Sequence, residues 1–119
     1  MPKILIIDDE PDVIEFQKSY LLRRKYEVFT AVNTPQALEA IKNYSPEVVF
    51  CDLRLETDTS GINIIEQAKK IKPNLIIYLV TGIIDKEIES EALAKGAKEI
   101  LHKPLSNEEL EKKIKEVLF

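Results

Sequence analysis

The strongest constraint on the fold is a regular alternation of short apolar runs with longer amphipathic stretches. The chain has five such short runs, and four of them are continuously apolar in the middle. Continuous apolar runs are typical of parallel strands that are covered by helices on both faces of a sheet. The runs are Lys3–Asp8, Tyr26–Ala31, Glu47–Asp52, Leu75–Thr81 and Lys98–Lys103.

The stretches between and after the runs have the apolar spacing of amphipathic helices. The fourth, expected over about residues 85–95, has a thin apolar face. The expected faces are Val13, Phe16 and Tyr20; Ala37, Ile41 and Tyr44; Ile64, Ala68 and Ile71; Ile88 and Ala92; and Leu110, Ile114, Val117 and Leu118.

Several residues mark the ends of these expected helices. Thr34 and Pro35 suit the N-cap and the first helical position of the second helix. Pro73 ends the third helix, and Gly96 suits the C-cap of the fourth. Ser106 begins a capping box in front of the fifth helix.

Five strands that alternate with five helices predict an α/β fold, a doubly wound parallel five-stranded sheet with right-handed crossovers. A length of 119 residues corresponds to one domain of common size. No internal repeat or linker interrupts the pattern. We therefore expect a single domain over residues 1–119, with no output domain in this chain.

Composition and charge exclude several classes of protein. A hydrophobic content of 45% is too high for a disordered chain. The net charge of −4 argues against a general nucleic-acid binder. No apolar run approaches the roughly 20 residues of a membrane helix, so we expect no membrane partner. The single cysteine, Cys51, cannot form an internal disulfide, and we expect a buried thiol in a cytoplasmic protein.

Polar residues follow the expected strands where each strand ends. Ligands of open parallel sheets bind at the carboxyl ends of the strands, so we expect these side chains to meet at one edge. They are Asp8, Asp9 and Glu10 after the first strand, Asp52 at the end of the third, Thr81 at the end of the fourth and Lys103 at the end of the fifth.

This set of side chains predicts a phosphoryl-transfer site. Carboxylates that are held close together raise one another's pKa unless a cation lies among them, and Mg²⁺ prefers such oxygen ligands. Lys103 supplies a positive charge for a phosphate, and Thr81 supplies a hydroxyl. An aspartate can itself be the nucleophile of such a site and form an acyl phosphate.

Each residue also has a plain structural interpretation. Asp9 can cap the helix that Pro11 begins, Thr81 can cap a turn, and Lys103 can be a surface lysine. Asp52 fits a structural role less well, because a buried acid without a partner costs free energy. His102 is expected to be structural or exposed. The placement of the polar residues at the same end of separate strands favours function.

Four motifs, "IDDEPD", "VVFCDLRL", "LVTG" and "KGAKEILHKP", occur in this order along the chain. Together with the alternating pattern, they make the sequence resemble the receiver domain of two-component response regulators over nearly its full length. The resemblance implies a flavodoxin-like (βα)5 fold with strand order 2-1-3-4-5, the order of the family's chemotaxis member.

The resemblance implies a phosphorylation-dependent signalling switch. Asp52 would accept a phosphoryl group from a histidine kinase or a phosphotransfer protein, and the domain would catalyse only this transfer and the later hydrolysis. Thr81 and Lys103 would contact phosphoryl oxygens, and the Lys103–Pro104 bond would be cis, as X-Pro bonds allow.

The same resemblance implies a magnesium site. Asp8 and Asp9 would bind Mg²⁺, directly or through water, together with Asp52 and the backbone carbonyl of Arg54. An output protein would bind the face formed by the fourth helix, the fifth strand and the fifth helix, and a homodimer is compatible with this scheme.

The sequence departs from the family pattern at two places. The family often has a proline where this chain has Glu56, and Gly61 lies one residue further from the acceptor than the usual glycine. We expect Glu56 or Asp58 to compete for the metal or to repel a phosphodonor. Many receivers carry an aromatic residue at the position of Ile100, so an aromatic ring cannot transmit the switch here.

Three alternatives stay open. A receiver-like module that binds partners regardless of phosphorylation is favoured by both departures. A flavodoxin-like nucleotide or flavin binder would need a phosphate-binding loop after the first strand, where this chain has acids. A haloacid-dehalogenase-type phosphatase would need an Asp-x-Asp pair that is missing.

Overall fold

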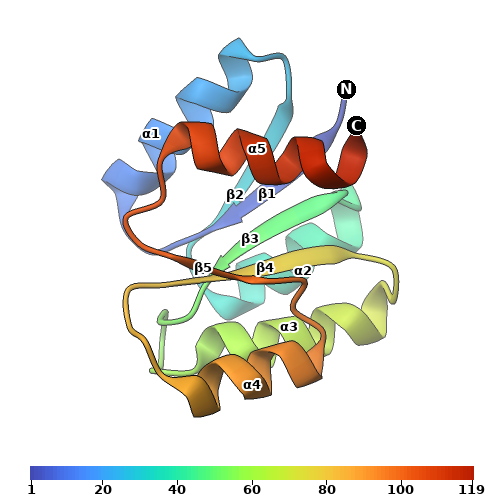
Figure 1. Ribbon diagram of the computed structural model, residues 1–119. Helices are drawn as coiled ribbons and strands as arrows, with labels where there is room; N and C mark the ends of the chain where they lie inside the picture. Colours follow the sequence, from blue (N-terminus) through green and yellow to red (C-terminus); the bar gives the residue numbers. More distant parts are fainter.

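In the computed structural model, which describes residues 1–119, strands and helices alternate along the chain (Figure 1). The elements are β1 (Lys3–Ile7), α1 (Pro11–Arg23), β2 (Glu27–Ala31), α2 (Thr34–Tyr44), β3 (Val48–Asp52), α3 (Ser60–Ile71), β4 (Ile76–Thr81), α4 (Lys86–Lys95), β5 (Ile100–His102) and α5 (Asn107–Leu118). All the expected strands and helices are present, so the predicted α/β class is confirmed. None of the helices is long and apolar enough to cross a membrane.

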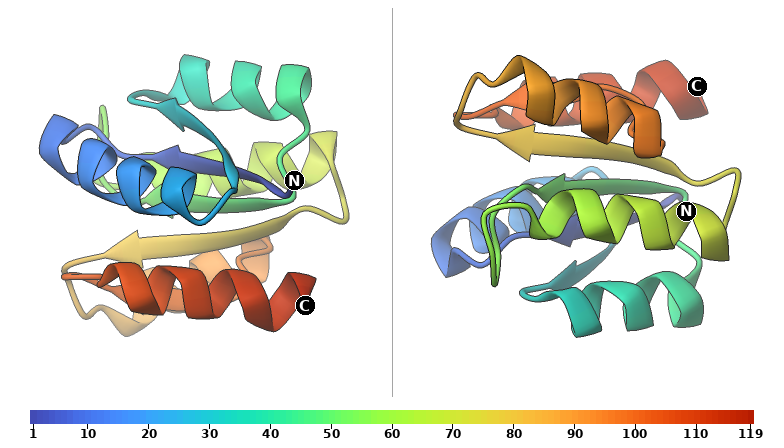
Figure 2. Two further views of the ribbon diagram at one scale, coloured as in Figure 1. Left: turned by 90° about the horizontal axis from the view of Figure 1, so that it is seen from above. Right: turned by 90° about the horizontal axis from the view of Figure 1, so that it is seen from below.

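The strands form one parallel sheet in the order β2-β1-β3-β4-β5, which confirms the flavodoxin-like topology. Helices α1 and α5 cover one face of the sheet, and α2, α3 and α4 cover the other (Figures 1 and 2). Every residue of the central strand β3 is buried. Burial on both faces explains why the central strands are apolar without alternation.

Side chains of β1 alternate between two core clusters, one on each face of the sheet. Ile4 and Ile6 pack with residues of α1 and α5. Leu5 and Ile7 pack with residues of α2, α3 and α4. All four side chains are at most 1% exposed, and burial of one such side chain contributes roughly 1.5–3 kcal/mol. The two clusters hold the strand ends, and thus the edge of the sheet, in a fixed arrangement.

The predicted buried face of α1 was wrong in part. Phe16 is 66% exposed, whereas Gln17 is 8% exposed and Leu21 is fully buried. The stripe that faces the sheet runs through Ile14, Gln17 and Leu21, about 100° around the helix from the predicted stripe. A polar residue in the middle of the buried stripe made the neighbouring stripe look more apolar in the sequence.

The N-cap of α2 is Asn33 and not Thr34. The Asn33 side chain accepts a hydrogen bond from the backbone N–H of Gln36 at 2.9 Å, and Thr34 is the first helical residue. Asparagine is at least as good an N-cap as threonine, and proline is tolerated throughout the first turn. The Ser106 cap is confirmed, because its Oγ accepts from the backbone N–H of Glu109 at 3.1 Å.

Helix α4 has the thin apolar face that the sequence predicts. Ala92 is its one buried residue, and Ile88 is partly buried against the core. The Lys95 ammonium donates to the Glu66 carboxylate of α3 at 2.8 Å. Gly96 ends the helix with φ of 122°, a left-handed conformation that glycine adopts without strain. The helix therefore depends on few apolar contacts.

Helix α3 begins in direct contact with the end of β3, and Gly61 makes this contact possible. Its N–H donates to the backbone oxygen of Leu53 at 2.8 Å. A Cβ atom on Gly61 would lie 2.5 Å from the backbone oxygen of Asp52 and 2.8 Å from the Cα of Leu53. Because backbone atoms cannot yield as a flexible side chain can, only glycine fits here.

We predict that Gly61→Ala destabilises the protein by about 1–3 kcal/mol, the usual cost of overpacking. The change is measured as the free energy of unfolding in urea. Gly82→Ala is the matched control, since a Cβ there would meet only the Lys103 Cβ, at 3.9 Å. An unchanged Gly61→Ala protein would show that α3 moves away from β3 at little cost.

Candidate phosphoryl-transfer site

The carboxyl ends of four strands bring polar side chains to one edge of the sheet. Asp8 follows β1, Asp52 ends β3, Thr81 ends β4 and Lys103 follows β5. The backbone N–H of Lys103 donates to the Thr81 carbonyl at 2.8 Å, which fixes the base of the lysine side chain against β4. The Lys103–Pro104 peptide bond is cis, as expected. The structure thus brings together the residues that the sequence placed at this edge.

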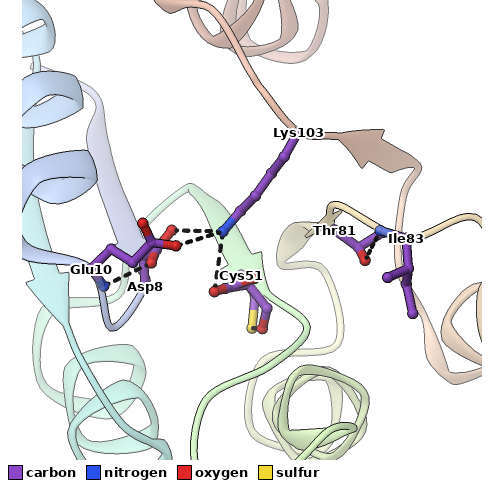
Figure 3. Close-up of polar contacts among 7 residues, drawn as sticks. Asp8, Glu10, Cys51, Thr81, Ile83 and Lys103 are labelled. Atoms are coloured by element: carbon purple, nitrogen blue, oxygen red, sulfur yellow. Dashed lines mark hydrogen bonds and ion pairs between the residues drawn. The ribbon is translucent and has the colours of Figure 1, made fainter.

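The Lys103 ammonium lies among three carboxylates. Its Nζ is 3.3 Å from Asp8 Oδ2, 3.3 Å from Asp52 Oδ2 and 3.9 Å from Glu10 Oε1. Figure 3 shows the lysine reaching from the end of β5 toward Asp8 and Glu10. The other Asp8 oxygen accepts from the backbone N–H of Glu10 at 2.9 Å. One cation therefore connects the ends of β1, β3 and β5.

Burial changes the proton affinity of this cluster. Asp52 is 6% exposed, and its burial raises its pKa to about 6, because the desolvation outweighs the attraction of Lys103 and the Asp8 carboxylate adds repulsion. For Lys103, burial opposes the charged form, but the Asp52 and Asp8 carboxylates outweigh it, so its pKa lies above the usual range. At neutral pH, Asp52 is mostly an anion and Lys103 is a cation.

A cavity of about 380 Å³ opens beside the cluster. It is bounded by the ends of the strands and by the loops that follow β3 and β4. Its walls include five of the predicted site residues: Asp9, Asp52, Arg54, Thr81 and Lys103. Asp8, the sixth, is held at the cluster by Lys103. A phosphoryl group has room to reach the Asp52 carboxylate from this cavity.

The acids after β1 form the group that suits a metal ion. Oxygen atoms of Asp8, Asp9 and Glu10 lie within 4.8 Å of one another, and Asp9 and Glu10 are exposed. Carboxylate oxygens with open access fit a hard cation such as Mg²⁺, which keeps several waters when bound. Glu10 was not among the predicted ligands. Its position directly after the two aspartates is the sequence signal that could have identified it.

The Thr81 hydroxyl caps the turn after β4. It accepts a hydrogen bond from the backbone N–H of Ile83 at 3.1 Å, and the residue is 3% exposed (Figure 3). This is the structural role that the sequence also allowed. Thr81 also borders the cavity next to Asp52, and its own O–H stays free to donate to a ligand there, because the hydroxyl oxygen is only the acceptor in the bond with Ile83.

The structure holds the Glu56 carboxylate against α2, away from the acceptor cavity. Its carboxylate accepts hydrogen bonds from the Thr34 N–H and hydroxyl, both at 2.8 Å, at the N-terminus of α2. The N–H of Thr34 is the main reason why the pKa of Glu56 is lowered. Asp58 is 89% exposed at its side chain and lies 4.0 Å from Arg54. Neither acid borders the cavity beside Asp52. For Glu56, the reason is that the N-terminus of α2 offers it two hydrogen-bond donors.

Two other residues have the structural roles that the sequence predicts. Cys51 is fully buried, and burial, with the nearby Asp52 and Asp8 charges, raises the pKa of its thiol far above the usual range. The thiol is therefore inert. His102 is exposed and its Nε2 lies 3.3 Å from the Glu89 carboxylate of α4, outside the acidic cluster.

Comparison with known proteins points to the same family. The family model described as response regulator receiver domain matches residues 4–115. The transcriptional regulatory protein ZraR of Klebsiella oxytoca is 30% identical over 115 residues, which are 97% of this chain. The chain spans only 26% of the length of that relative.

Solved structures agree with the fold. A response regulator receiver domain protein from Methanospirillum hungatei JF-1 is 31% identical, with a TM-score of 0.91 over 98% of this chain and 92% of that one. A response regulator from Burkholderia pseudomallei, solved with a phosphorylated aspartic acid, a calcium ion and citrate, is 27% identical. Its TM-score is 0.85 over 99% of this chain and 74% of that one.

We predict that Asp52→Asn stabilises the metal-free protein at pH 7.5 by about 1–3 kcal/mol, since one pKa unit corresponds to about 1.4 kcal/mol. A raised pKa in the folded state means that the folded protein binds the proton more tightly. Ionised Asp52 therefore destabilises the wild type above pH 6.

The difference between the two proteins should shrink as the pH falls below about 6 and vanish below about 4, the pKa of an unfolded aspartate. Urea unfolding in the presence of a chelator, at pH values across this range, measures it. A gap that stays constant with pH would contradict the raised pKa.

For the loop after β3, we predict that Glu56→Gln lowers stability by about 0.5 kcal/mol, because a charge at the N-terminus of α2 is lost. Magnesium affinity should stay unchanged, which thermal shift with increasing Mg²⁺ would measure. Asp58→Asn is the control from the same loop. If Glu56→Gln bound magnesium more tightly and Asp58→Asn did not, the Glu56 carboxylate would compete for the metal ion after all.

Proposed function

The chain belongs to the response regulator receiver domain family, and from this premise we propose that it is a phosphorylation-dependent signalling switch with Asp52 as its phosphoryl acceptor. The observation that carries the proposal is the pairing of the buried Asp52 carboxylate with Lys103 at 3.3 Å, beside an open cavity. A histidine kinase or a phosphotransfer protein would supply the phosphoryl group.

In the proposed step, an Asp52 carboxylate oxygen attacks the phosphorus of the donor and forms an acyl phosphate. The bond from phosphorus to the donor's leaving group breaks, and the leaving group takes the electron pair. A pKa of about 6 keeps the Asp52 nucleophile ionised at neutral pH. Later hydrolysis by water returns the carboxylate, so the only substrate of the domain is its own side chain.

Lys103 and Thr81 have separate roles in this proposal. The Lys103 ammonium pairs with a phosphoryl oxygen and offsets the charge that arrives at a site already crowded with carboxylates. The Thr81 hydroxyl, which accepts from Ile83 at 3.1 Å, turns to donate to another phosphoryl oxygen. Because the same hydroxyl caps the turn after β4, a shift of Thr81 toward the phosphoryl group couples phosphorylation to the segment that leads into α4.

Magnesium completes the proposed site. Asp8 and Asp9 would hold it together with Asp52 and the Arg54 carbonyl, and Glu10 lies close enough to join them. When bound, Mg²⁺ supplies positive charge between the carboxylates and the phosphoryl oxygens. The Burkholderia relative, which carries a phosphorylated aspartic acid and a calcium ion, supports a divalent cation of this kind.

We further propose that an output protein, or a second copy of the chain, binds the face formed by α4, β5 and α5. Support comes from the thin apolar contact of α4 and from the Glu89–His102 contact, which joins α4 to β5 at 3.3 Å. Ile100 is partly buried against the core and has no ring to swing. Movement of α4 itself would then transmit the switch.

A receiver-like module that works without phosphorylation is the second candidate. Ile100 favours it, because the usual aromatic reporter of the family is missing. The complete set of acceptor, acids, hydroxyl and lysine opposes it, since a binding module has no need of charges buried at this cost.

The deciding experiment is intact-mass spectrometry after incubation with acetyl phosphate. We expect one phosphoryl group per chain in the presence of Mg²⁺, none with a chelator, and none on Asp52→Asn. Thr81→Ala should react at least about tenfold more slowly, because one hydrogen bond to a charged oxygen is lost. Asp58→Asn should behave as the wild type.

Failure of acetyl phosphate would direct the test to a panel of phosphorylated histidine kinases and phosphotransfer proteins. If none of them modified the chain, the module that works without phosphorylation would replace the switch. An adduct that persists on Asp52→Asn would assign the acceptor to another residue.

A further inference from the structure

A second cavity, of about 440 Å³, lies on the α1 and α5 side of the sheet, behind the acceptor site. Its floor is the apolar face of the central strands, with Ile6, Phe50 and Val80. Val13 and Phe16 of α1 line one side. Phe16 is the side chain that the sequence placed in the core and that is 66% exposed. An exposed ring therefore borders an apolar hollow that the proposed phosphoryl transfer does not use.

This apolar cavity adjoins the acceptor site through three charged residues. Glu10, Asp52 and Lys103 line both hollows, which otherwise have different walls. Lys103 thus borders both hollows. A molecule in the apolar cavity would contact the back of the charged cluster without entering the space beside Thr81 and Arg54.

Gln17 is the polar residue inside the apolar cavity. It is 8% exposed and lines the hollow, and its side chain forms none of the hydrogen bonds within the protein, although its amide atoms are not sealed from solvent. An occupant of the cavity that carries a donor or an acceptor can therefore pair with this amide in place of solvent. The amide can both donate and accept.

Charge adds a second requirement for an occupant. Asp8, Glu10 and Asp52 present three carboxylates to the apolar cavity, against the single ammonium of Lys103. An anion would be repelled, whereas a cation would find carboxylates at one end and apolar walls along the rest. The volume also lies within the usual range for small-molecule sites.

We propose that the apolar cavity binds a small aromatic cation. Such a ligand has a monocyclic or bicyclic aromatic ring system and carries an amine. The ring packs on Phe50 and Val80 against Phe16, a ring nitrogen donates to the Gln17 amide oxygen, and the ammonium faces the carboxylate of Glu10. Each contact satisfies one of the three features of the cavity: its apolar floor, its unpaired amide and its excess negative charge.

Binding has a consequence for the acceptor site that rests on the proposed function. The ligand's ammonium draws on carboxylates of the proposed magnesium site, so the ligand and Mg²⁺ compete. A bound ligand would slow the phosphorylation of Asp52 by acetyl phosphate. The binding itself does not depend on this step and is measured separately, so the two proposals can fail independently.

The test uses three probes that share the indole ring system and differ in charge: tryptamine is a cation, indole is neutral and indole-3-acetate is an anion. They are titrated into the ¹⁵N-labelled chain without Mg²⁺, and the side-chain amide signals of Gln17 are followed by NMR. We expect tryptamine to bind at least about tenfold more tightly than indole, and indole-3-acetate to bind most weakly. Added Mg²⁺ should weaken the binding of tryptamine and leave the affinity for indole unchanged.

Variants locate the bound probe. Gln17→Leu should weaken tryptamine roughly fivefold through loss of one hydrogen bond, and Phe16→Ala should weaken it through loss of a wall. Leu22→Ala is the control, because Leu22 is also an exposed apolar residue of α1 but lies outside the cavity. Gln17→Leu places an apolar side chain of similar size at this position, and an unfolding midpoint no lower than that of the wild type verifies its fold.

The proposal is overturned if no probe shifts the Gln17 signals, if the three probes bind equally, or if neither variant differs from Leu22→Ala. Normal binding without any change in the rate of phosphorylation would remove only the competition with Mg²⁺. A chain that binds tryptamine but takes no phosphoryl group would overturn the proposed function and leave the ligand site in place.

Discussion

The contact on which the site depends is that of the Lys103 ammonium with carboxylates from two different strand ends. Asp8 and Asp52 are 5% and 6% exposed, and without a cation their charges would be buried and uncompensated. One ammonium faces two carboxylates, so the cluster keeps a net negative charge, and burial, with the repulsion of Asp8, raises the pKa of Asp52 in spite of Lys103. The site is therefore short of positive charge, and it is this deficit that makes it responsive to a metal ion or to a change of charge on Asp52.

The scaffold divides into a rigid part and a weakly held part. The strand ends are fixed by ladder hydrogen bonds and by two core clusters, and the approach of α3 to β3 is as close as Gly61 allows. Helix α4 buries only Ala92 fully. Local stability increases with the number of buried apolar contacts. A displacement of Thr81, at the end of β4, would therefore move α4 more easily than the strands.

The sequence was misleading where a polar side chain had an unexpected partner or none. Gln17 interrupts the inward stripe of α1, and this polar residue shifted the predicted face to Phe16. Glu56 lies in the loop that follows the acceptor, but its donors are on Thr34, which is distant in the chain. Periodicity and spacing carry no information about such partners, because they are determined by how helices pack.

The sequence by itself determined the order of the strands and helices, the burial of the central strands and the meeting of acids, hydroxyl and lysine at one edge. These follow from local rules: apolar periodicity, caps, and the shared direction of parallel strands. Only the tertiary structure decided that Lys103 bridges Asp8 and Asp52, that Glu56 turns to α2, and that a hollow remains beside Gln17. Each of these depends on distances between side chains that are far apart in the sequence, and packing alone sets those distances.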